Sequence, residues 1–331
     1  MAHKGRHLSM GYDAKNLPSY SELPVKAGAP AGSAWGLFGD DDQLGTLNLL
    51  TAERVVEAAK LVRKGAVFPM NLSIDQPDPP LFGRGAPKQN FVVGEVHRDD
   101  SLDNFWPQAS SQWDSLRHIL HPREGFYNGV TAEEVVAGGG KLGIENMARR
   151  GIAGRGVLLD VARHLERAGE RLDYTTASVI TKDMLDGCAK AQGVEVRTGD
   201  VLLVRTGWLT WYLNEATAEQ REYMAGDAMT QLRAPGIGPD EEMAAYLWDL
   251  HVAAVAGDNP SLQAWPPGPE SGGFMHFRLI PLFGMPIGEL WWLDDLANDC
   301  AADSVYEFLL TSAPLSVPGG VGSPPNALAI K

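Results

Sequence analysis

The sequence predicts an α/β protein. Three runs of continuous apolar residues, at 156–161, 201–205 and 252–256, are typical of strands that are covered on both faces. Segments with helical spacing of apolar residues alternate with these runs, as expected of a sheet flanked by helices. No repeat and no obvious linker divides the chain. We therefore expect one domain over residues 34–331, preceded by an extended arm over residues 1–33 that is rich in Pro, Gly, Ser and Lys.

The first half of the chain contains one well-marked helix. Thr51 is a typical N-cap residue, apolar residues follow it at helical spacing, and Gly65 is expected to end the helix. A short strand is predicted at 67–72. Residues 75–90 are rich in proline and glycine and form a long loop, of the kind that often carries function.

The glycine-rich stretch at 138–140 is interpreted as a flexible connection. Lys141 follows it, but no Ser or Thr comes next and no glycine lies at the spacing that a phosphate-binding loop requires.

The second half of the chain alternates strands and helices. The strand at 156–161 leads into a helix that ends near Gly169, and Thr181 caps a helix that runs to about Gln192. The strand at 201–205 follows. Pro239 begins a helix that precedes the strand at 252–256. Regular structure ends with residues 303–310 and with an apolar strand in the tail.

Composition excludes several classes of function. The net charge of −14 and the pI of about 5.0 argue against a nucleic-acid partner, because the acidic surface would repel phosphate backbones. The two cysteines, Cys188 and Cys300, form no CxxC motif and favour a reducing compartment. No apolar run is long enough to span a membrane, and the first residues lack the apolar segment of a signal peptide. We expect a cytoplasmic protein with no membrane partner.

Residues 111–121, SQWDSLRHILH, concentrate groups that could carry chemistry. Gln112, Asp114, His118 and His121 offer an amide, a carboxylate and two imidazoles, and Gln108 lies just before them. If the stretch is extended, Trp113 points away from Gln112 and Asp114 and packs into the core. The alternative is a polar surface loop.

Two further groups could complete a site. The first is His276 with the later carboxylate of Glu289. The second is Asp258 with Asn259, which come directly after a predicted strand, where side chains often face a cleft. Imidazoles and carboxylates together are the ligands of Zn²⁺ or Mn²⁺. Spacing alone cannot show that residue 114 and residue 276 meet.

Six sequence blocks, in order, resemble the cyclase family of hydrolases, which includes bacterial kynurenine formamidases and isatin hydrolases. They are GSAWGLFGDDDQLGTLNLLT, SSQWDSLRH, RGVLLDV, GDVLLVRTGW, VAGDNPS and HFRLIPLFGMPIGE, and the resemblance covers roughly residues 35–310. It implies the swivelling β/β/α fold, a barrel-like mixed sheet with flanking helices. It also implies a homodimer or a homotetramer, for which the N-terminal arm could wrap a partner subunit.

The family signature is H-x-G-T-H-x-D-x-P-x-H, followed later by a His and a Glu. By this resemblance Asp114 and His276 are metal ligands with Glu289, and His118 is an acid/base residue together with Asp114. The chain departs from the signature at Gln108 and Gln112, which replace two histidines, and at Leu116, which replaces the proline. An amide oxygen is a weaker metal ligand than imidazole.

The resemblance predicts an enzyme that hydrolyses an amide, imide or lactone of a small, ring-containing molecule. Asp114, His276 and Glu289, with Gln112, would hold a divalent ion, Zn²⁺ or Mn²⁺. In a metal-free site the amides of Gln108 and Gln112 would instead donate hydrogen bonds to a substrate carbonyl. Further candidates for substrate binding are Trp106, Phe126 and Tyr127, and one of Arg117, Arg205 and Arg278 could bind a carboxylate.

Two other functions stay open at this stage. One is a metal-independent lyase or cyclase of secondary metabolism, with His118 and Asp114 as acid and base. The other is a family member that binds a small ligand without catalysis, which the two glutamines at signature positions favour. His121 has no counterpart in the signature.

Overall fold

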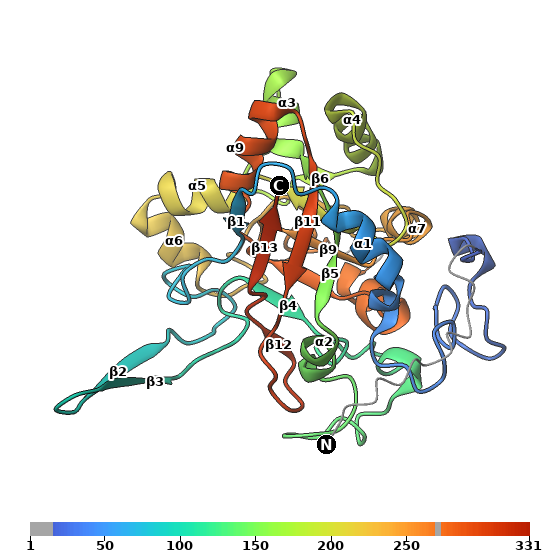
Figure 1. The fold of residues 1–331 in the computed structure, drawn as a ribbon, viewed down its shortest axis with the longest axis horizontal. Helices are drawn as coiled ribbons and strands as arrows, with labels where there is room; N and C mark the ends of the chain where they lie inside the picture. Colours follow the sequence, from blue (N-terminus) through green and yellow to red (C-terminus); the bar gives the residue numbers. More distant parts are fainter. Residues whose placement is uncertain (1–15, 269–272) are drawn as a thin grey trace.

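The computed structural model describes residues 16–268 and 273–331, and its centre is a mixed sheet (Figure 1). The sheet contains β1 (Val67–Pro69), β4 (Gln112–Asp114), β5 (Ile152–Asp160), β7 (Val201–Arg205), β9 (Ala254–Gly257), β10 (Ile287–Glu289), β11 (Glu307–Ser312), β12 (Gly322–Ser323) and β13 (Ala327–Ile330). The strand order is β1-β13-β11-β5-β7-β9-β10-β4-β12. The four central strands β5, β7, β9 and β10 are parallel, and the pairs outside them are antiparallel. The sheet curls into a half-barrel, which confirms the predicted fold class.

Helices cover both faces of this sheet. Within the described residues they are α1 (Ala52–Ala59), α2 (Ile144–Arg150), α3 (Val161–Arg167), α4 (Lys182–Gln192), α5 (Trp208–Asn214), α6 (Ala218–Met224), α7 (Glu241–Asp249), α8 (Met275–Phe277) and α9 (Asp294–Asp303). Apolar residues of α3, α4, α5 and α7 join the core on one face, and those of α2 and α9 join the core on the other. None of these helices is long and apolar enough to cross a bilayer.

Two hydrophobic cores explain the continuous apolar strands. In β5, Val157 and Leu159 belong to one core and Leu158 belongs to the other. In β7, Leu202 and Leu203 divide in the same way. Because successive side chains of a strand point to opposite faces, a strand buried on both sides is apolar at every position.

Several predicted boundaries agree with the structure. The strand at 201–205 is β7, the helix from Thr181 is α4, and the hydroxyl of Thr181 accepts a hydrogen bond from the Met184 N–H at 3.3 Å. The predicted end of the first helix is wrong, because α1 ends at Ala59 and not near Gly65. After α1 the chain turns toward the C-terminal strand, where the Lys64 and Ala66 N–H groups donate to the Lys331 carbonyl.

The first strand is also shorter than predicted. β1 ends at Pro69, and beyond it the Leu72 N–H donates to the hydroxyl of Ser111 at 2.8 Å, so the chain leaves β13 and runs toward β4. The two-residue strands β6 (Val179–Ile180) and β8 (Gly236–Ile237) and the helices α5, α6, α8 and α9 were not predicted from the sequence.

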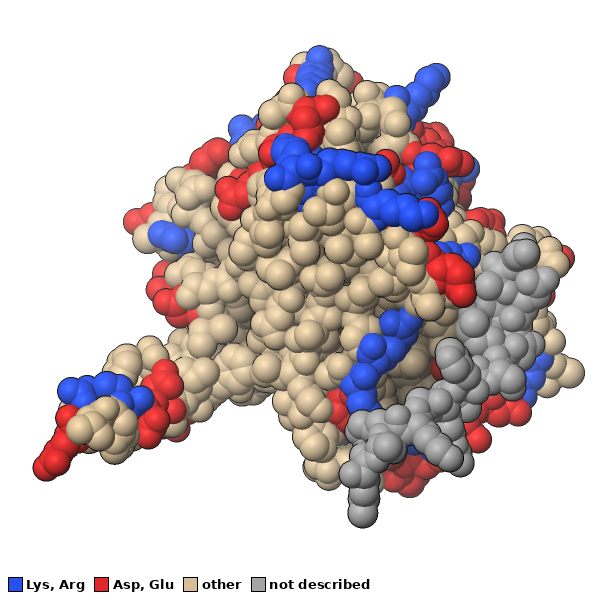
Figure 2. Space-filling model, viewed as in Figure 1, with Lys and Arg blue, Asp and Glu red and all other residues tan. Residues whose placement is uncertain are grey.

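A hairpin of β2 (Lys88–Val93) and β3 (Arg98–Asp103) projects from the body (Figures 1 and 2). It exposes apolar side chains, including Phe91 and Val96. The sequence did not predict it, because neither strand has a buried face that would give an alternating pattern. The base of the hairpin leads into the site described below.

The described part of the N-terminal arm lies over α7. The Trp248 indole donates to the Pro18 carbonyl at 2.9 Å, and the Tyr20 hydroxyl donates to Glu241 at 2.8 Å. Residues 1–15 of the predicted arm lie outside the described residues. The division into an arm and one domain stays a prediction.

Candidate active site

The antiparallel pairing of β4 with β10 positions the first part of the site. Gln112 lies opposite Glu289, and Asp114 lies opposite Ile287. Because side chains alternate along a strand, Gln112, Asp114 and Glu289 share one face of the sheet. Trp113 points to the other face, where it is fully buried, packs edge-on against Trp291 at 4.7 Å and donates to the Ser312 hydroxyl at 2.9 Å. The predicted core position of Trp113 is confirmed.

His276 reaches the same place from the short helix α8. Its Nε2 lies 3.0 Å from Oε1 of Glu289 and 4.0 Å from Oδ2 of Asp114. One ligand atom from each of these three buried residues lies within 4.8 Å of the others. We call Asp114, His276 and Glu289 the buried cluster. The structure therefore brings together three residues that are far apart in the sequence.

Two glutamines, Gln112 and Gln263, contact residues of the buried cluster. The amide of Gln112 donates to Oε2 of Glu289. Oε1 of Gln263 accepts from the Met275 N–H at 2.6 Å and faces Nδ1 of His276 at 3.4 Å. Since an amide oxygen can only accept, Nδ1 of His276 carries the proton, and Nε2 presents its lone pair to the two carboxylates.

His118 lies at the edge of the buried cluster. Its Nε2 is 3.8 Å from Oδ2 of Asp114, and its side chain is 23% exposed, whereas that of Asp114 is fully buried. The amide nitrogen of Gln108 is 2.5 Å from Oδ1 of Asp114 and 3.0 Å from Nδ1 of His118. Gly322 permits this arrangement, because a Cβ there would lie 2.6 Å from the Gln108 side chain. Gln108 thus fixes the carboxylate and the imidazole relative to each other.

Burial dominates the electrostatics of the buried cluster. It raises the pKa of Glu289 to about 8 and also raises the pKa of Asp114. Burial lowers the pKa of His276 to about 4 and lowers that of His118. In the protein without a bound cation, both imidazoles are therefore neutral at neutral pH and Glu289 can hold a proton between its carboxyl group and Nε2 of His276.

The residues present fit a divalent cation. Oδ2 of Asp114 and Oε1 of Gln112 are buried and have no hydrogen-bond partner among the described residues. Buried acceptors without partners cost free energy unless a cation or a donor meets them. Two carboxylates, an imidazole nitrogen and an amide oxygen are a mixed nitrogen and oxygen set of the kind that binds transition ions.

Sequence reasoning missed Arg84 and a wall of aromatic rings. Arg84 donates to the Gln108 carbonyl and lies over the ring of Phe82, 5.0 Å from its centroid. Phe82 contacts Trp265, Trp265 contacts Phe274, and Phe274 stacks on His276 at 4.1 Å with an interplanar angle of 7°. The only sequence signal was that Arg84 and Phe82 fall in the long loop at 75–90.

The other predicted substrate-binding residues have partners outside the buried cluster. Trp106 is half-exposed at the base of the hairpin and donates to the Asn104 side chain at 2.7 Å. Phe126 and Tyr127 are buried, and the Tyr127 hydroxyl donates to Asp42 at 3.2 Å. Among the described residues, no hydrogen bond and no ring–ring contact joins these three rings to Asp114 or His276. Their role in substrate binding stays a prediction.

Several charged candidates have structural partners. Arg117 donates to the carbonyls of Val136 and Gly139, and Arg205 pairs with Asp160 and Asp294. Asp258 and Asn259 are hydrogen-bonded to backbone groups, and their position at a cleft stays a prediction. Both side chains are buried. Asp258 accepts hydrogen bonds from the N–H groups of Thr206 and Gly207 at the start of α5, and Asn259 donates to the Pro235 carbonyl.

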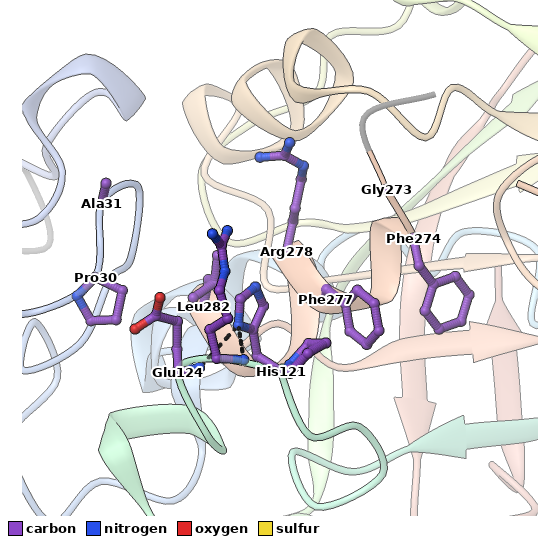
Figure 3. Close-up of a pocket in the computed structure, with 11 residues that line it drawn as sticks. Pro30, Ala31, His121, Glu124, Gly273, Phe274, Phe277, Arg278 and Leu282 are labelled. Atoms are coloured by element: carbon purple, nitrogen blue, oxygen red, sulfur yellow. Dashed lines mark hydrogen bonds between the residues drawn. The ribbon is translucent and has the colours of Figure 1, made fainter. Parts of the chain in front are cut away.

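His121 and Arg278 line a cavity of about 360 Å³ beside the site (Figure 3). Nδ1 of His121 accepts from the N–H groups of Arg123 and Glu124, and its ring meets Phe277 edge-on at 5.7 Å. Phe274 also lines this cavity. Since Phe274 stacks on His276, one aromatic ring separates the cavity from the buried cluster.

A second cavity, of about 500 Å³, lies beside α1. Basic side chains gather around α1 in Figure 2, and those that line the cavity are Arg54, Lys60, Arg63, Arg155 and Arg197. None of the residues predicted to form the site lines this cavity.

The fold and the buried cluster define a mixed α/β protein with an imidazole–carboxylate site suited to a metal ion. The chain belongs to the cyclase family, since the "Cyclase" family model matches residues 48–264. This confirms the family resemblance found in the sequence.

Solved structures agree with this assignment. The crystal structure of a novel cyclase has 34% sequence identity and a TM-score of 0.78, with 90% of this chain and 99% of that chain covered. Isatin hydrolase A from Labrenzia aggregata, bound to benzyl benzoate, has 16% identity and a TM-score of 0.57, with 84% of this chain and 97% of that one covered. An isatin hydrolase bound to the product analogue thioisatinate has 16% identity and a TM-score of 0.56, with 84% and 98% covered. No curated protein matches the chain significantly.

Proposed function

We propose that this protein is a metal-dependent hydrolase that opens an amide, imide or lactone bond in a small, ring-containing molecule. One observation carries the proposal: the buried cluster presents Nε2 of His276 and the carboxylates of Asp114 and Glu289 within 4.8 Å of one another. The unpartnered Oδ2 of Asp114 and Oε1 of Gln112 support it, because both are acceptors that a cation would satisfy.

The metal ion in this proposal is Zn²⁺ or Mn²⁺. Asp114, His276 and Glu289 would be its ligands, with Gln112 as a weaker oxygen ligand. A bound divalent ion would polarise the scissile carbonyl and acidify water. Gln263 would fix the tautomer of His276, since its Oε1 faces Nδ1 and leaves Nε2 free to bind.

His118 is proposed to move a proton between water and the leaving group. Its partial exposure lets it meet a substrate, and its lowered pKa keeps it neutral and able to accept a proton at neutral pH. The position of Gln108 between His118 and Asp114 makes it a positioning residue. When Nδ1 of His118 is protonated, the amide of Gln108 can turn and present its oxygen as the acceptor.

The likeness to isatin hydrolases supports the substrate class. Those proteins are named for isatin, and one of them binds thioisatinate as a product analogue. The aromatic wall formed by Phe82, Trp265 and Phe274 is suited to a flat ring.

The test combines metal analysis with activity. We expect about one divalent ion per chain by elemental analysis, and turnover of at least one member of a panel of lactones, imides and N-formyl aromatics. A chelator should abolish turnover, and Zn²⁺ or Mn²⁺ should restore it. Activity that persists after complete removal of metal would instead favour a metal-independent lyase or cyclase.

The variant Glu289→Gln sharpens this test, because it removes the charge and keeps the shape. We expect this variant to lose the bound metal and to lower activity by more than about 100-fold. That loss exceeds the one typical of residues that only hydrogen-bond to a metal ligand. The control Glu145→Gln changes a carboxyl group that is also buried, but that accepts a hydrogen bond from the Gly319 N–H outside the site. It should keep the metal. Equal metal content in both variants would contradict the proposed site.

A further inference from the structure

Arg84 is a charged residue of the site that has an incomplete set of partners. Its guanidinium donates to the Gln108 carbonyl and lies on the Phe82 ring. A guanidinium has five N–H donors. Among the described residues, no other hydrogen bond and no ion pair with a carboxylate involves Arg84. The remaining donors are thus available to a ligand.

Gln108 links this guanidinium to the buried cluster. Gln108, whose carbonyl it binds, directs its own side chain to Asp114 and His118. The charge of Arg84 acts on Asp114 and Glu289, and it lowers the pKa of both carboxyl groups against the larger effect of burial. The positive charge of Arg84 therefore affects both carboxyl groups of the buried cluster.

An anion, or a group that becomes an anion during the reaction, suits the unused donors of Arg84. Within the described residues no carboxylate forms an ion pair with this guanidinium, which donates to the Gln108 carbonyl and lies on the Phe82 ring. A guanidinium presents its N–H groups as a planar pair that matches two carboxylate oxygens. A positively charged donor also stabilises negative charge that develops on an oxygen.

We propose that Arg84 receives the acyl oxygen of the substrate and that this acyl group is attached to an aromatic ring. The inference rests on the proposed hydrolase function and specifies its substrate. Arg84 provides the planar pair of donors that matches a carboxylate. Phe82 lies under the guanidinium and begins the wall that continues through Trp265 and Phe274 to His276. The substrate ring lies along this wall.

The reaction balances without a further reactant. The oxygen of water adds to the acyl carbon, and the carbonyl electron pair moves onto the oxygen held by Arg84. When this pair returns, the bond from the acyl carbon to nitrogen or oxygen breaks. The leaving atom takes one proton of the water through His118. The second proton goes to solvent as the acid ionises, and the product is an aromatic carboxylate bound to Arg84.

Binding of benzoate and benzamide tests the inference, because the two molecules differ in charge and hardly in shape. Calorimetry would be done on the whole chain, both metal-free and loaded with Zn²⁺. We expect benzoate to bind at least about 10-fold more tightly than benzamide to the metal-free protein, in which Arg84 and not a metal ion receives the carboxylate. In Arg84→Gln this preference should disappear, although the new amide can still donate to the Gln108 carbonyl. Arg84→Lys keeps the charge and should restore part of the preference.

The control is Arg150→Gln, since Arg150 donates to the carbonyls of Leu50 and Gly151, away from the site. It should bind both probes as the unchanged protein does. The inference is overturned if Arg84→Gln keeps the preference for benzoate, or if the unchanged protein binds benzoate no better than benzamide.

Turnover supplies a second, separable readout. With any substrate of the panel, Arg84→Gln should lower kcat by about 10²–10³-fold and change KM little, as expected for a group that binds the reacting oxygen. A change in KM alone would overturn the assignment. If no panel member is hydrolysed, the proposed function fails, and the benzoate measurement on metal-free protein still decides the role of Arg84.

Discussion

Nε2 of His276 lies 3.0 Å from Oε1 of Glu289, and in the tautomer that Gln263 favours this nitrogen carries no proton. Gln263 holds the single ring proton of His276 on the opposite side. A proton on Glu289 or a cation between the two groups is needed to remove the repulsion of the lone pairs. This pair therefore couples metal binding to pH.

Metal affinity should rise with pH up to about 8. Burial raises the pKa of Glu289 to about 8, so below that pH a metal ion must displace a proton. His276, with its pKa lowered to about 4, stays neutral and adds no competing proton. Calorimetric Zn²⁺ titrations in buffers of different ionisation enthalpy should show proton release at about pH 6.5 and less release at about pH 8.5. Equal affinity at both pH values would contradict this coupling.

His118→Ala should remove activity without unfolding the protein. The side chain is partly exposed and is joined to its neighbours by the contacts with Gln108 and Asp114. We expect kcat to fall by about 10²–10⁴-fold and the thermal midpoint to change little. His97→Ala is the matched control, because His97 is exposed on the hairpin. Unchanged kcat in His118→Ala would rule out its proton-transfer role.

Trp113→Phe should destabilise the fold by about 2 kcal/mol, because the change leaves a cavity beside Trp291 and removes the hydrogen bond to Ser312. The free energy of unfolding, from denaturant titration, measures this loss. The half-exposed Trp106 gives the comparison: Trp106→Phe should change stability by no more than about 0.5 kcal/mol. Similar losses in the two variants would show that burial of Trp113 does not anchor β4.

Lys331 should contribute stability that disappears in acid. It is buried, and its Nζ lies 2.8 Å from Asp299 and 2.8 Å from Asp303. Burial by itself would raise the pKa of Asp303. Hydrogen bonds from Lys331 and Lys64 outweigh the effect of burial and lower this pKa from the ordinary 3.8 to about 2. A lowered carboxyl pKa stabilises the fold above the ordinary value, and this contribution is lost as the pH falls toward 2.

The variant Lys331→Met isolates this effect. Its urea midpoint should lie below that of the unchanged protein at neutral pH, and the difference should shrink as the pH approaches about 2. The control Lys26→Met breaks the exposed pair with Asp40 and should have almost no effect. A difference that stays constant with pH would mean that Lys331 acts through packing alone.

The elements that the sequence predicted well are those with a strong local pattern. β7 and α4 were predicted because a continuous apolar run and a capping threonine are visible within a few residues. The hairpin of β2 and β3 was missed because neither strand has a buried face, and α8 was missed because three residues are too few to show a helical pattern. Arg84 was missed because nothing in its local sequence shows that its loop folds back onto Gln108.

By itself the sequence determined the α/β class, the family resemblance and the identity of Asp114, His118, His276 and Glu289 as candidates, because residue types and local order carry that information. Only the tertiary structure decided that three of them form one buried cluster. The antiparallel register of β4 with β10 sets Gln112 against Glu289, and the packing of α8 brings in His276. Register and packing depend on contacts between distant segments, which no local pattern contains.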